Sequence, residues 1–250
     1  MKRVLLVSCD GLGNGGIQSV IMNIVRNLHE KFIFDILLFT KEKRYYDDEF
    51  IKCGGQIYRI PKYGGKNRLI KKIDYYISGL YIYYHVKNII KSNNYDVVHC
   101  HNDLDSLPII IALLLNNVKV RIVHTHVMHN YKYFLDKIFN YIRLFLIYKF
   151  SSLMVACSEQ SGKHEYGNKK FIIINNTFDN KKFYFNKYEK KSESFNMIQV
   201  GRFDSNKNQI FTIKVLYELI KKGLDVRLDL VGQNDNVYIN KMHEIIHKYN

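Results

Sequence analysis

The first 28 residues constrain the fold of this chain more than any other stretch. An unbroken apolar run at residues 4–7 predicts a strand that is covered on both faces, as the strands of parallel sheets are. A glycine-rich loop follows and ends in Gly15-Gly16. From Ile17 onward, apolar residues recur at helical spacing and form one stripe. A strand, a tight loop and a helix in direct succession predict an α/β fold with a parallel sheet.

The junction between this loop and the helix also predicts a chemical property. The first N–H groups of a helix have no partner within the helix, and they lie at the positive end of its dipole. A glycine-rich loop lets a ligand approach that end closely, so the junction suits a phosphate or another anion. The alternative is that the glycines only permit a tight turn.

The loop contains a dinucleotide-binding pattern, which the rest of the sequence does not support. Gly11, Gly13 and Gly16 match G-x-G-x-x-G. That pattern also requires an acidic residue at the carboxyl end of the second strand, where the residue binds a ribose. Asp35 lies at the right distance along the chain, but near the beginning of its expected strand. We therefore expect no NAD-type cofactor.

Strands and helices alternate along the next part of the chain. Strands are expected at residues 32–40, 56–60, 97–101, 121–126, 152–157 and 171–175, and helices at 45–52, 67–93, Leu107–Leu115 and 131–150. This alternation predicts a parallel sheet with helices on both faces. We expect the first domain to comprise residues 1–178.

Residues 179–195 are polar and have no periodicity, so we expect them to be a linker. A second domain is expected at 196–250. Its predicted strands are 197–201 and 226–232, and its predicted helices are 209–222 and 237–249. Ile210, Ile213, Leu216, Tyr217 and Ile220 would form one apolar face of its first helix. Two strands cannot bury both faces of a sheet, so we expect this domain to be incomplete.

The composition narrows the class of protein. Hydrophobic residues make up 47% of the chain, yet no apolar run reaches the length of a transmembrane helix, and the N-terminus lacks the features of a signal peptide. We therefore expect a cytosolic protein, with its four separated cysteines reduced. The net charge of +15 fits nucleic acid, an anionic membrane or phosphorylated substrates. Because no nucleic-acid-binding motif accompanies the charge, we expect no nucleic-acid partner.

Two His-x-His pairs end two of the expected strands, His99/His101 and His124/His126. Ligands of α/β sheets collect outside the carboxyl ends of strands, so the pairs are expected near one another. Zinc is one interpretation, because alternate residues of a strand point the same way. We favour the other, in which one histidine of each pair packs in the core and no metal binds. His126 is then the preferred substrate contact.

The loop after residue 200 carries two cations before a helix. Arg202 and Lys207 bracket this loop, and Gly201 precedes them at the end of a strand. Arg supplies a planar fork for phosphate oxygens, and Lys supplies a mobile point charge. With a helix start beside them, the two residues predict a diphosphate-binding site. The alternative is two solvated loop cations.

These motifs together resemble the bacterial family 4 glycosyltransferases, which are retaining enzymes of the GT-B fold. The matches run in family order: GGIQ (15–18), YDVVHCH (95–101), IVHTH (122–126), ACSE (156–159), IINNTFD (173–179), VGRF (200–203) and KNQ (207–209). The resemblance implies two facing Rossmann-like domains, the first one complete in this chain, with a nucleotide sugar between them.

The resemblance also implies roles for individual residues. Arg202 and Lys207 would bind the donor diphosphate, Gly15 and Gly16 would line the donor–acceptor pocket, and His126 would contact the transferred sugar. Further substrate-binding positions by this resemblance are Gln18, His101, Asn102, Ser158, Gly201 and Gln209. The reaction would move a hexose-type sugar from a nucleoside diphosphate to a glycan or lipid-linked acceptor with retention. It would use no metal, and the departing phosphate would take the acceptor proton.

Family members usually carry a glutamate pair, E-x7-E, further along the second domain, and this sequence has no such region. An inactive, truncated binding module is therefore the alternative to an enzyme. The resemblance further implies a capsule, exopolysaccharide or related cell-surface glycan pathway. The expected helix 67–93 mixes lysines with tyrosines, so it suits an anionic membrane surface. The alternative is that its tyrosines pack on the sheet and its lysines are solvated.

Overall fold

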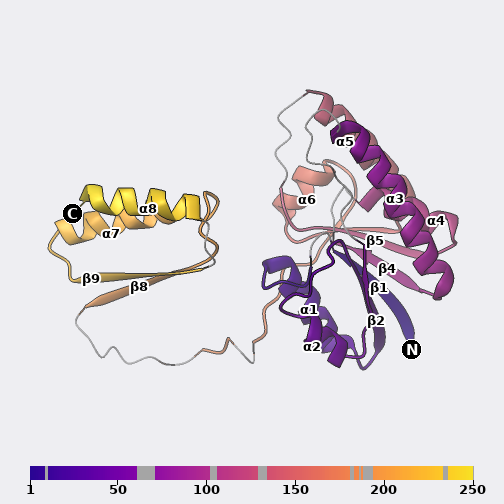
Figure 1. The fold of residues 1–250 in the computed structure, drawn as a ribbon, viewed down its shortest axis with the longest axis horizontal. Helices are drawn as coiled ribbons and strands as arrows, with labels where there is room; N and C mark the ends of the chain where they lie inside the picture. The colour runs from indigo at the N-terminus through magenta and orange to yellow at the C-terminus, as the bar shows by residue number, and fades with distance from the viewer. Residues whose placement is uncertain are drawn as a thin grey trace. The chain divides into compact units, whose positions relative to one another are not determined.

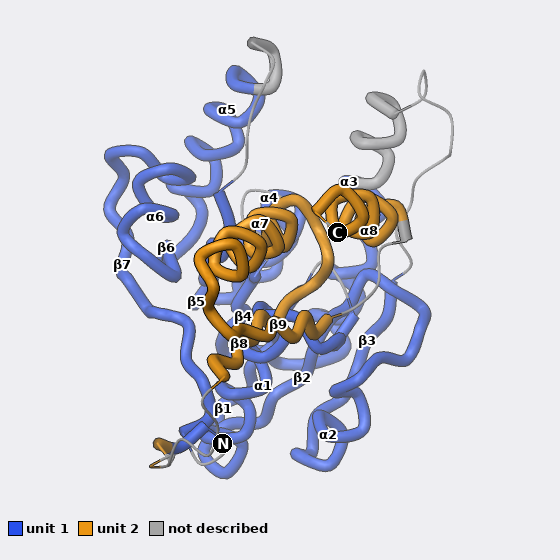
Figure 2. The backbone as a smooth tube through the Cα atoms, turned by 90° about the vertical axis from the view of Figure 1, so that its left-hand side faces the viewer, with its two compact units in different colours: residues 1–184 blue, residues 185–250 orange. Residues whose placement is uncertain are grey.

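The computed structural model describes residues 1–8, 11–60, 71–101, 106–128, 134–180, 183–185, 187, 194–232 and 236–249. Side chains are described for these residues except 71–78, 134–136 and 236. The chain divides into two compact units, Met1–Tyr184 and Phe185–Asn250 (Figure 2). The division falls inside the segment 179–195, where a linker is expected.

The first unit is built on a seven-stranded sheet in the order β3-β2-β1-β4-β5-β6-β7, and every pair of neighbours is parallel. The strands are β1 (Lys2–Ser8), β2 (Phe32–Leu38), β3 (Ile57–Arg59), β4 (Val97–Cys100), β5 (Val120–Thr125), β6 (Leu153–Ala156) and β7 (Ile172–Ile173). Strand β1 lies between β2 and β4, and its apolar residues 4–7 are buried because both faces of the strand are covered. The predicted parallel α/β fold is confirmed.

Helices cover both faces of this sheet. They are α1 (Gly16–Leu28), α2 (Asp47–Lys52), α3 (Lys71–Ser92), α4 (Leu107–Leu115), α5 (Phe134–Phe150) and α6 (Glu159–Tyr166). One buried cluster joins the sheet to α1 and α2, and another joins its opposite face to α3, α4, α5 and α6. Figure 1 shows α1 and α2 on one side of the sheet and α3, α4 and α5 on the other.

Asp35 has a structural role in this sheet. Its carboxylate accepts a hydrogen bond from Arg3 Nε at 2.7 Å and one from the Tyr95 hydroxyl at 2.8 Å. The backbone N–H of Gln56 donates to its other oxygen at 3.0 Å. Asp35 is 1% exposed, and Arg3 is the second residue of β1, at the amino end of that strand. The side chain therefore points away from the carboxyl ends of the strands, as predicted.

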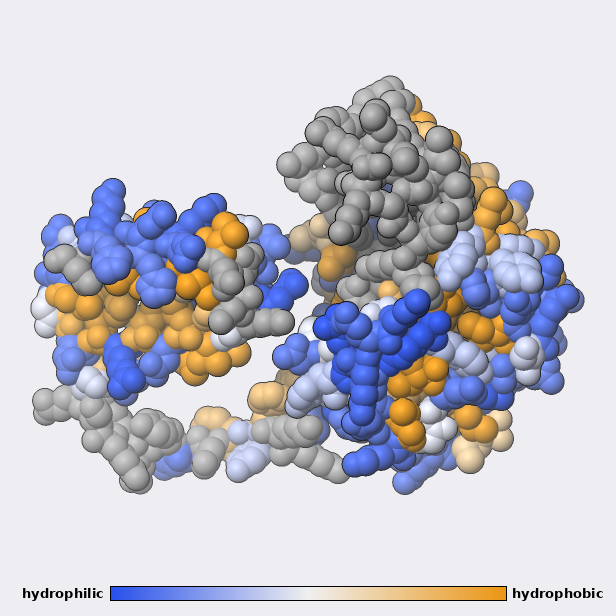
Figure 3. Space-filling model, viewed as in Figure 1, coloured by the Kyte–Doolittle hydropathy of each residue, from blue (hydrophilic) through white to orange (hydrophobic). Residues whose placement is uncertain are grey.

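The second unit contains β8 (Phe195–Val200), α7 (Gln209–Lys221), β9 (Val226–Val231) and α8 (Asn236–Tyr249), and its two strands are parallel. Both helices lie on the same side of the strands (Figure 1). Ile198, Val200 and Val231 on the strands are exposed by 68%, 71% and 48%. Figure 3 shows the resulting hydrophobic band across this unit.

Some expectations from the sequence need correction. α6 was not predicted, because its polar sequence has no apolar stripe. Ile220 does not share the buried face of α7, since it lies in the last turn and is 53% exposed. β7 has only two residues, fewer than the expected strand at 171–175. The expected starts of the helices at 67 and 131 lie outside the described residues. No helix among the described residues is long and apolar enough to cross a membrane.

Candidate functional site

The glycine-rich loop leads into α1 without capping the helix. Gly15 occupies the N-cap position in an extended conformation, with φ −79° and ψ 171°, and no side chain of the described chain caps the helix. The first turn contains no acidic residue. The first helical hydrogen bond runs from Ser19 N to Gly15 O at 2.9 Å. The N–H groups of Gly16, Ile17 and Gln18 therefore remain suited to an anion.

Backbone conformation does not explain the glycines of this loop. The described glycines with positive φ are Gly54, Gly167 and Gly223. A Cβ atom added at Gly13 or Gly16 would meet no atom within 4 Å. A tight turn therefore does not require glycine at these two positions. Open space beside the helix start favours the close approach of a ligand.

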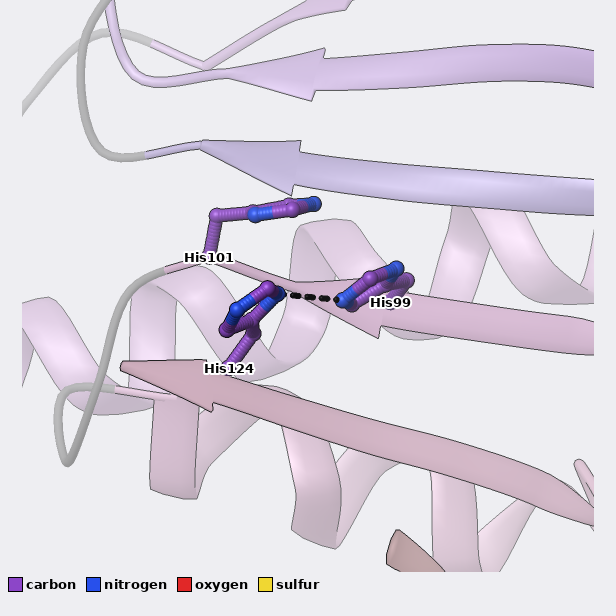
Figure 4. Close-up of side chains that lie close together, drawn as sticks. All are labelled: His99, His101 and His124. Carbon is purple, nitrogen blue, oxygen red and sulfur yellow. Dashed lines mark hydrogen bonds between the residues drawn. The ribbon is translucent and has the colours of Figure 1, made fainter. Parts of the chain in front are cut away.

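Four histidines lie together at the carboxyl ends of β4 and β5, and Figure 4 shows three of them. The register pairs His99 with Ile122 and Cys100 with Val123, which places His101 beside His124. Because alternate residues of a strand share a face, all four rings lie on the face that carries α1. The prediction that the two pairs lie near one another is confirmed.

Five pairs of these imidazole rings are in contact, three stacked and two tilted, with ring centroids 4.1–5.3 Å apart. His99 Nε2 lies 3.2 Å from His124 Nδ1, and His101 Nδ1 lies 2.8 Å from His126 Nε2. His101 and His124 are only 2% and 1% exposed. Their Nε2 atoms are buried and have no hydrogen-bond partner among the described residues.

Burial keeps these rings neutral. It lowers the pKa of His99 to about 3 and that of His124 to about 2, and the neighbouring imidazoles add to the effect. The pKa of His101 lies well below its ordinary value for the same reasons. Burial also lowers the pKa of His126, which a hydrogen bond to Asn176 partly opposes. At neutral pH each ring therefore has one N–H group and one lone pair.

The segment that follows β7 covers this cluster. Asn175 Nδ2 donates to Cys157 O at 3.0 Å, and Asn23 Nδ2 of α1 donates to Thr177 O at 2.9 Å. Between these anchors, Asn176 Oδ1 lies 3.3 Å from His126 Nδ1. The segment thus connects α1 with the end of β6 across the histidines.

Asn176 sets the proton positions along one row of the cluster. Its Oδ1 only accepts hydrogen bonds, so His126 Nδ1 carries the proton and His126 Nε2 accepts from His101 Nδ1. Both ring nitrogens of His126 are therefore engaged within unit 1. A hydrogen bond from this ring to a sugar requires one of these partners to be replaced.

The remaining predicted residues of unit 1 have defined surroundings. Ser158 caps α6: its Oγ accepts from Ser161 N at 3.1 Å, and Ser161 Oγ accepts from Ser158 N at 3.2 Å. This reciprocal capping box gives Ser158 a structural role. The Gln18 side chain folds back toward Gly15 at the start of α1. Asn102 lies outside the described residues.

In unit 2, Asp204 shapes the loop between β8 and α7. Its Oδ1 accepts hydrogen bonds from the N–H groups of Asn206 and Lys207, both at 3.0 Å. Its other oxygen lies 3.6 Å from Arg202 Nη2, but the Arg202 side chain is 72% exposed. An exposed pair at this distance contributes little, so the guanidinium can turn toward an incoming anion.

Two glutamines fix the ends of the same loop. Gln199 Nε2 donates to Lys207 O, and the fully buried Gln209 donates from Nε2 to Arg202 O, both at 2.8 Å. Asn208 precedes α7 in the left-handed conformation, with φ 50° and no side-chain cap among the described residues. The loop thus holds two cations around an uncapped helix start, which is an arrangement suited to a phosphate.

The predicted site residues fall on both units. Unit 1 carries Gly15, Gly16, Gln18, His101, Asn102, His126 and Ser158, and unit 2 carries Gly201, Arg202, Lys207 and Gln209. Sequence reasoning missed the organising roles of Asn176, Gln199 and Asp204. The signal for Asp204 was present, because an Asp two residues before an amide it bonds is typical of an Asx turn.

The sequence profile of Glycosyltransferase Family 4 matches residues 14–180, which include the loop, the histidine cluster and the covering segment. The chain belongs to glycosyltransferase family 4. This assignment confirms the resemblance found in the motifs.

Two curated relatives of this family 4 chain are named as glycosyltransferases. EpsF of Bacillus subtilis (strain 168) is 27% identical over 252 residues, which cover 92% of this chain and 62% of EpsF. The capsular polysaccharide biosynthesis glycosyltransferase CapH of Staphylococcus aureus is 26% identical over 243 residues, which cover 94% of this chain and 63% of CapH. The chain thus spans less than two thirds of the length of either relative.

Several solved structures share the fold of this family 4 chain. HepE of Anabaena, in complex with UDP and glucose, has a TM-score of 0.70 at 14% identity, over 100% of this chain and 67% of HepE. The lipopolysaccharide outer core galactosyltransferase WaaB has a TM-score of 0.62 at 13% identity, over 99% of this chain and 65% of WaaB. These similarities confirm the predicted GT-B-like fold.

Proposed function

We propose that this protein transfers a hexose from a nucleoside diphosphate sugar to a glycan acceptor in the synthesis of a cell-surface polysaccharide. The observation that carries the proposal is the loop of unit 2, where Arg202 and Lys207 flank an uncapped helix start. Family membership supports the reaction class. The name of CapH supports the capsular pathway, and the UDP and glucose bound to HepE support a nucleotide-sugar donor.

In this reaction the bond between the anomeric carbon and the β-phosphate oxygen breaks, and a bond to the acceptor hydroxyl oxygen forms. Negative charge grows on the departing diphosphate, so groups that meet it there stabilise the transition state more than the ground state. Arg202, Lys207 and the N–H groups at the start of α7 would supply that stabilisation. The departing phosphate would take the proton of the acceptor hydroxyl, and the anomeric configuration would be retained.

The donor site is tested by substitution of its cations. Removing one donor to a developing oxyanion typically costs about 10²–10³ in rate, so we expect losses of this size in Arg202→Ala and Lys207→Ala. The matched control is Arg227→Ala on β9, which removes an arginine whose side chain is 75% exposed from the same unit. Transfer is measured as release of nucleoside diphosphate, and UDP binding is measured by calorimetry. Unchanged UDP binding in both loop variants would exclude this donor site.

A binding module without transferase activity is the second candidate, because the chain spans only 62–63% of its curated relatives. The same measurements separate the two functions. Turnover indicates the enzyme, whereas the absence of heat with every nucleotide sugar favours a binding module that lacks the donor half. No heat with any of the UDP-, GDP- and ADP-sugars contradicts donor binding by this chain.

We further propose that the acceptor is lipid-linked and that unit 1 associates with the cytosolic face of an anionic membrane. On α3, Tyr81 and Tyr83 pack against the core, as in the alternative in which the tyrosines of this helix pack on the sheet. Leu80 and Tyr84 of the same helix are exposed. Among the described residues, the exposed apolar side chains are more numerous on α5, where they are Ile138, Phe139, Tyr141, Ile142, Phe145 and Tyr148. These side chains and the net charge of +15 support the proposal.

Co-sedimentation with phosphatidylglycerol vesicles tests this association. We expect binding that weakens with added salt and with Phe145→Ser on α5. Ile220→Ser, which changes a comparably exposed residue of α7, serves as the matched control. Equal binding to neutral phosphatidylcholine vesicles would contradict the proposal.

A further inference from the structure

The histidine cluster has the composition of a metal site, which the transfer reaction does not require. We propose that His99, His101 and His124 bind one divalent transition-metal ion of the class that imidazole prefers, such as Zn²⁺. One ring nitrogen from each of the three residues is available, and these nitrogens all lie within 4.8 Å of one another (Figure 4).

The spacing of the first pair already suits a shared ion. His99 Nε2 and His124 Nδ1 are 3.2 Å apart. Two nitrogens bound to one tetrahedral zinc at its usual bond length are separated by about 3.3 Å. His101 follows β4 directly and stacks on His99 at 4.2 Å between ring centroids, so the third ring lies beside this pair.

The cluster is also incomplete as a hydrogen-bonding network. His101 Nε2 and His124 Nε2 are buried without a partner among the described residues. A buried polar atom without a partner is costly, and in native structures such an atom usually meets an ordered water or an ion. An ion bound by His101 Nε2 would satisfy one of these atoms, and His99 Nε2 and His124 Nδ1 would exchange their mutual hydrogen bond for bonds to the ion.

The surroundings orient one ligand, as they do in known metal sites. Metal-bound histidines usually donate their second ring N–H group to a fixed acceptor, which sets the tautomer. His101 Nδ1 donates to His126 Nε2 at 2.8 Å, and His126 Nδ1 donates to Asn176 Oδ1 at 3.3 Å. This row leaves the lone pair of His101 on Nε2.

Neither His-x-His pair has an Asp or Glu as its immediate neighbour in the sequence. The row of His126 and Asn176 provides the orientation that a carboxylate would otherwise provide. The side chains of Asp103 and Asp105 lie outside the described residues.

Metal titration of the chelator-treated protein tests the proposal. We expect one equivalent of Zn²⁺ to bind, and Co²⁺ to bind with the visible absorption of a tetrahedral nitrogen-ligated ion. His99→Gln and His124→Gln are expected to lose more than 100-fold in affinity. Asn176→Ala, which removes only the outer partner of the row, is expected to lose about 10–100-fold.

The control addresses the other histidine pair that could chelate an ion. His243 and His247 lie one helical turn apart on α8, and both are exposed. The double variant His243→Ala/His247→Ala should leave the Zn²⁺ affinity within twofold of the parent. Circular dichroism of each variant shows whether it is folded. The proposal is overturned if folded His99→Gln binds as the parent does, if the double variant abolishes binding, or if the parent binds no metal.

Discussion

At the residue scale, polar groups in the core of unit 1 fall into two kinds. Asp35 is fully partnered by Arg3, Tyr95 and the backbone of Gln56, whereas the buried histidines leave ring nitrogens without partners in the described chain. A satisfied buried network stabilises a fold, and an incompletely satisfied one marks a place where a ligand, ion or water is missing. Asp35 therefore has a structural role, whereas the histidines form the candidate site. The G-x-G-x-x-G pattern alone could not show that Asp35 is structural and does not bind a ribose.

The first prediction concerns Asp35. Asp35→Ala removes a buried carboxylate and leaves the Tyr95 hydroxyl and an N–H group without their acceptor. We expect the free energy of unfolding to fall by about 2–4 kcal/mol. Asp48→Ala is the control, because its exposed pair with Lys43 should change stability by less than about 0.5 kcal/mol. Urea unfolding measures both, and a loss of UDP binding by folded Asp35→Ala would contradict the purely structural role.

The second prediction concerns pH and the metal-free protein. The pKa of His99, about 3, and that of His124, about 2, lie below the ordinary value of 6.5. Below about pH 6.5 the unfolded chain therefore binds protons that the folded chain does not, so stability is complete above that pH and falls as the pH falls. Each such histidine contributes a slope of up to about 1.4 kcal/mol per pH unit.

Urea unfolding between pH 8 and pH 5, with a chelator present, measures this slope. His99→Gln should give a shallower dependence than the parent. His243→Gln, which removes an exposed histidine of α8, is the matched control. A stability that stays constant over this range would show that the rings are not held neutral by the fold.

At the element scale, the sequence predicted most elements because their apolar periodicity is strong. α1 and Leu107–Leu115 were found at or within one residue of their observed bounds. α6 was missed because it has no apolar stripe, although Ser158 at its start and Gly167 after its end are the usual boundary signals. The position of residues 175–177 could not be predicted, since their hydrogen bonds join parts of the chain that are far apart in sequence.

The third prediction concerns the pairing of β8 with β9 next to the loop between β8 and α7, which carries Arg202 and Lys207 and is called the cation loop below. Gly201 N donates to Val231 O at 2.9 Å, and a Cβ atom on Gly232 would overlap the backbone carbonyl of Gly201. Gly232→Ala therefore has to separate the strand ends, which should cost about 1–3 kcal/mol and weaken UDP binding at least tenfold. Gly13→Ala, where the added methyl group meets no atom within 4 Å, should leave the unfolding midpoint unchanged. Normal UDP binding by Gly232→Ala would show that UDP binding does not depend on the close pairing of these strand ends.

At the scale of the whole molecule, the two units differ in how much core they possess. The described residues of unit 2 include only two buried apolar side chains, Ile213 and Met242, and its sheet leaves Ile198 and Val200 exposed. Unit 1 holds two buried clusters that occupy both faces of its sheet. The sequence predicted this difference in core size, because two strands cannot bury both faces of their sheet.

The fourth prediction follows from that difference in core size. Because the buried clusters lie entirely within residues 1–184, a fragment of those residues should unfold cooperatively, with a midpoint within about 4 °C of the parent, which corresponds to less than about 1 kcal/mol. Residues 185–250 alone should unfold without a cooperative transition, since so little apolar surface is buried. The fragment 1–184 should bind Zn²⁺ but not UDP, because the histidines and the cation loop lie in different units. Zinc binding that requires residues 185–250 would place the metal ligands outside the histidine cluster, whereas UDP binding by 1–184 would place the diphosphate at the start of α1 instead of α7.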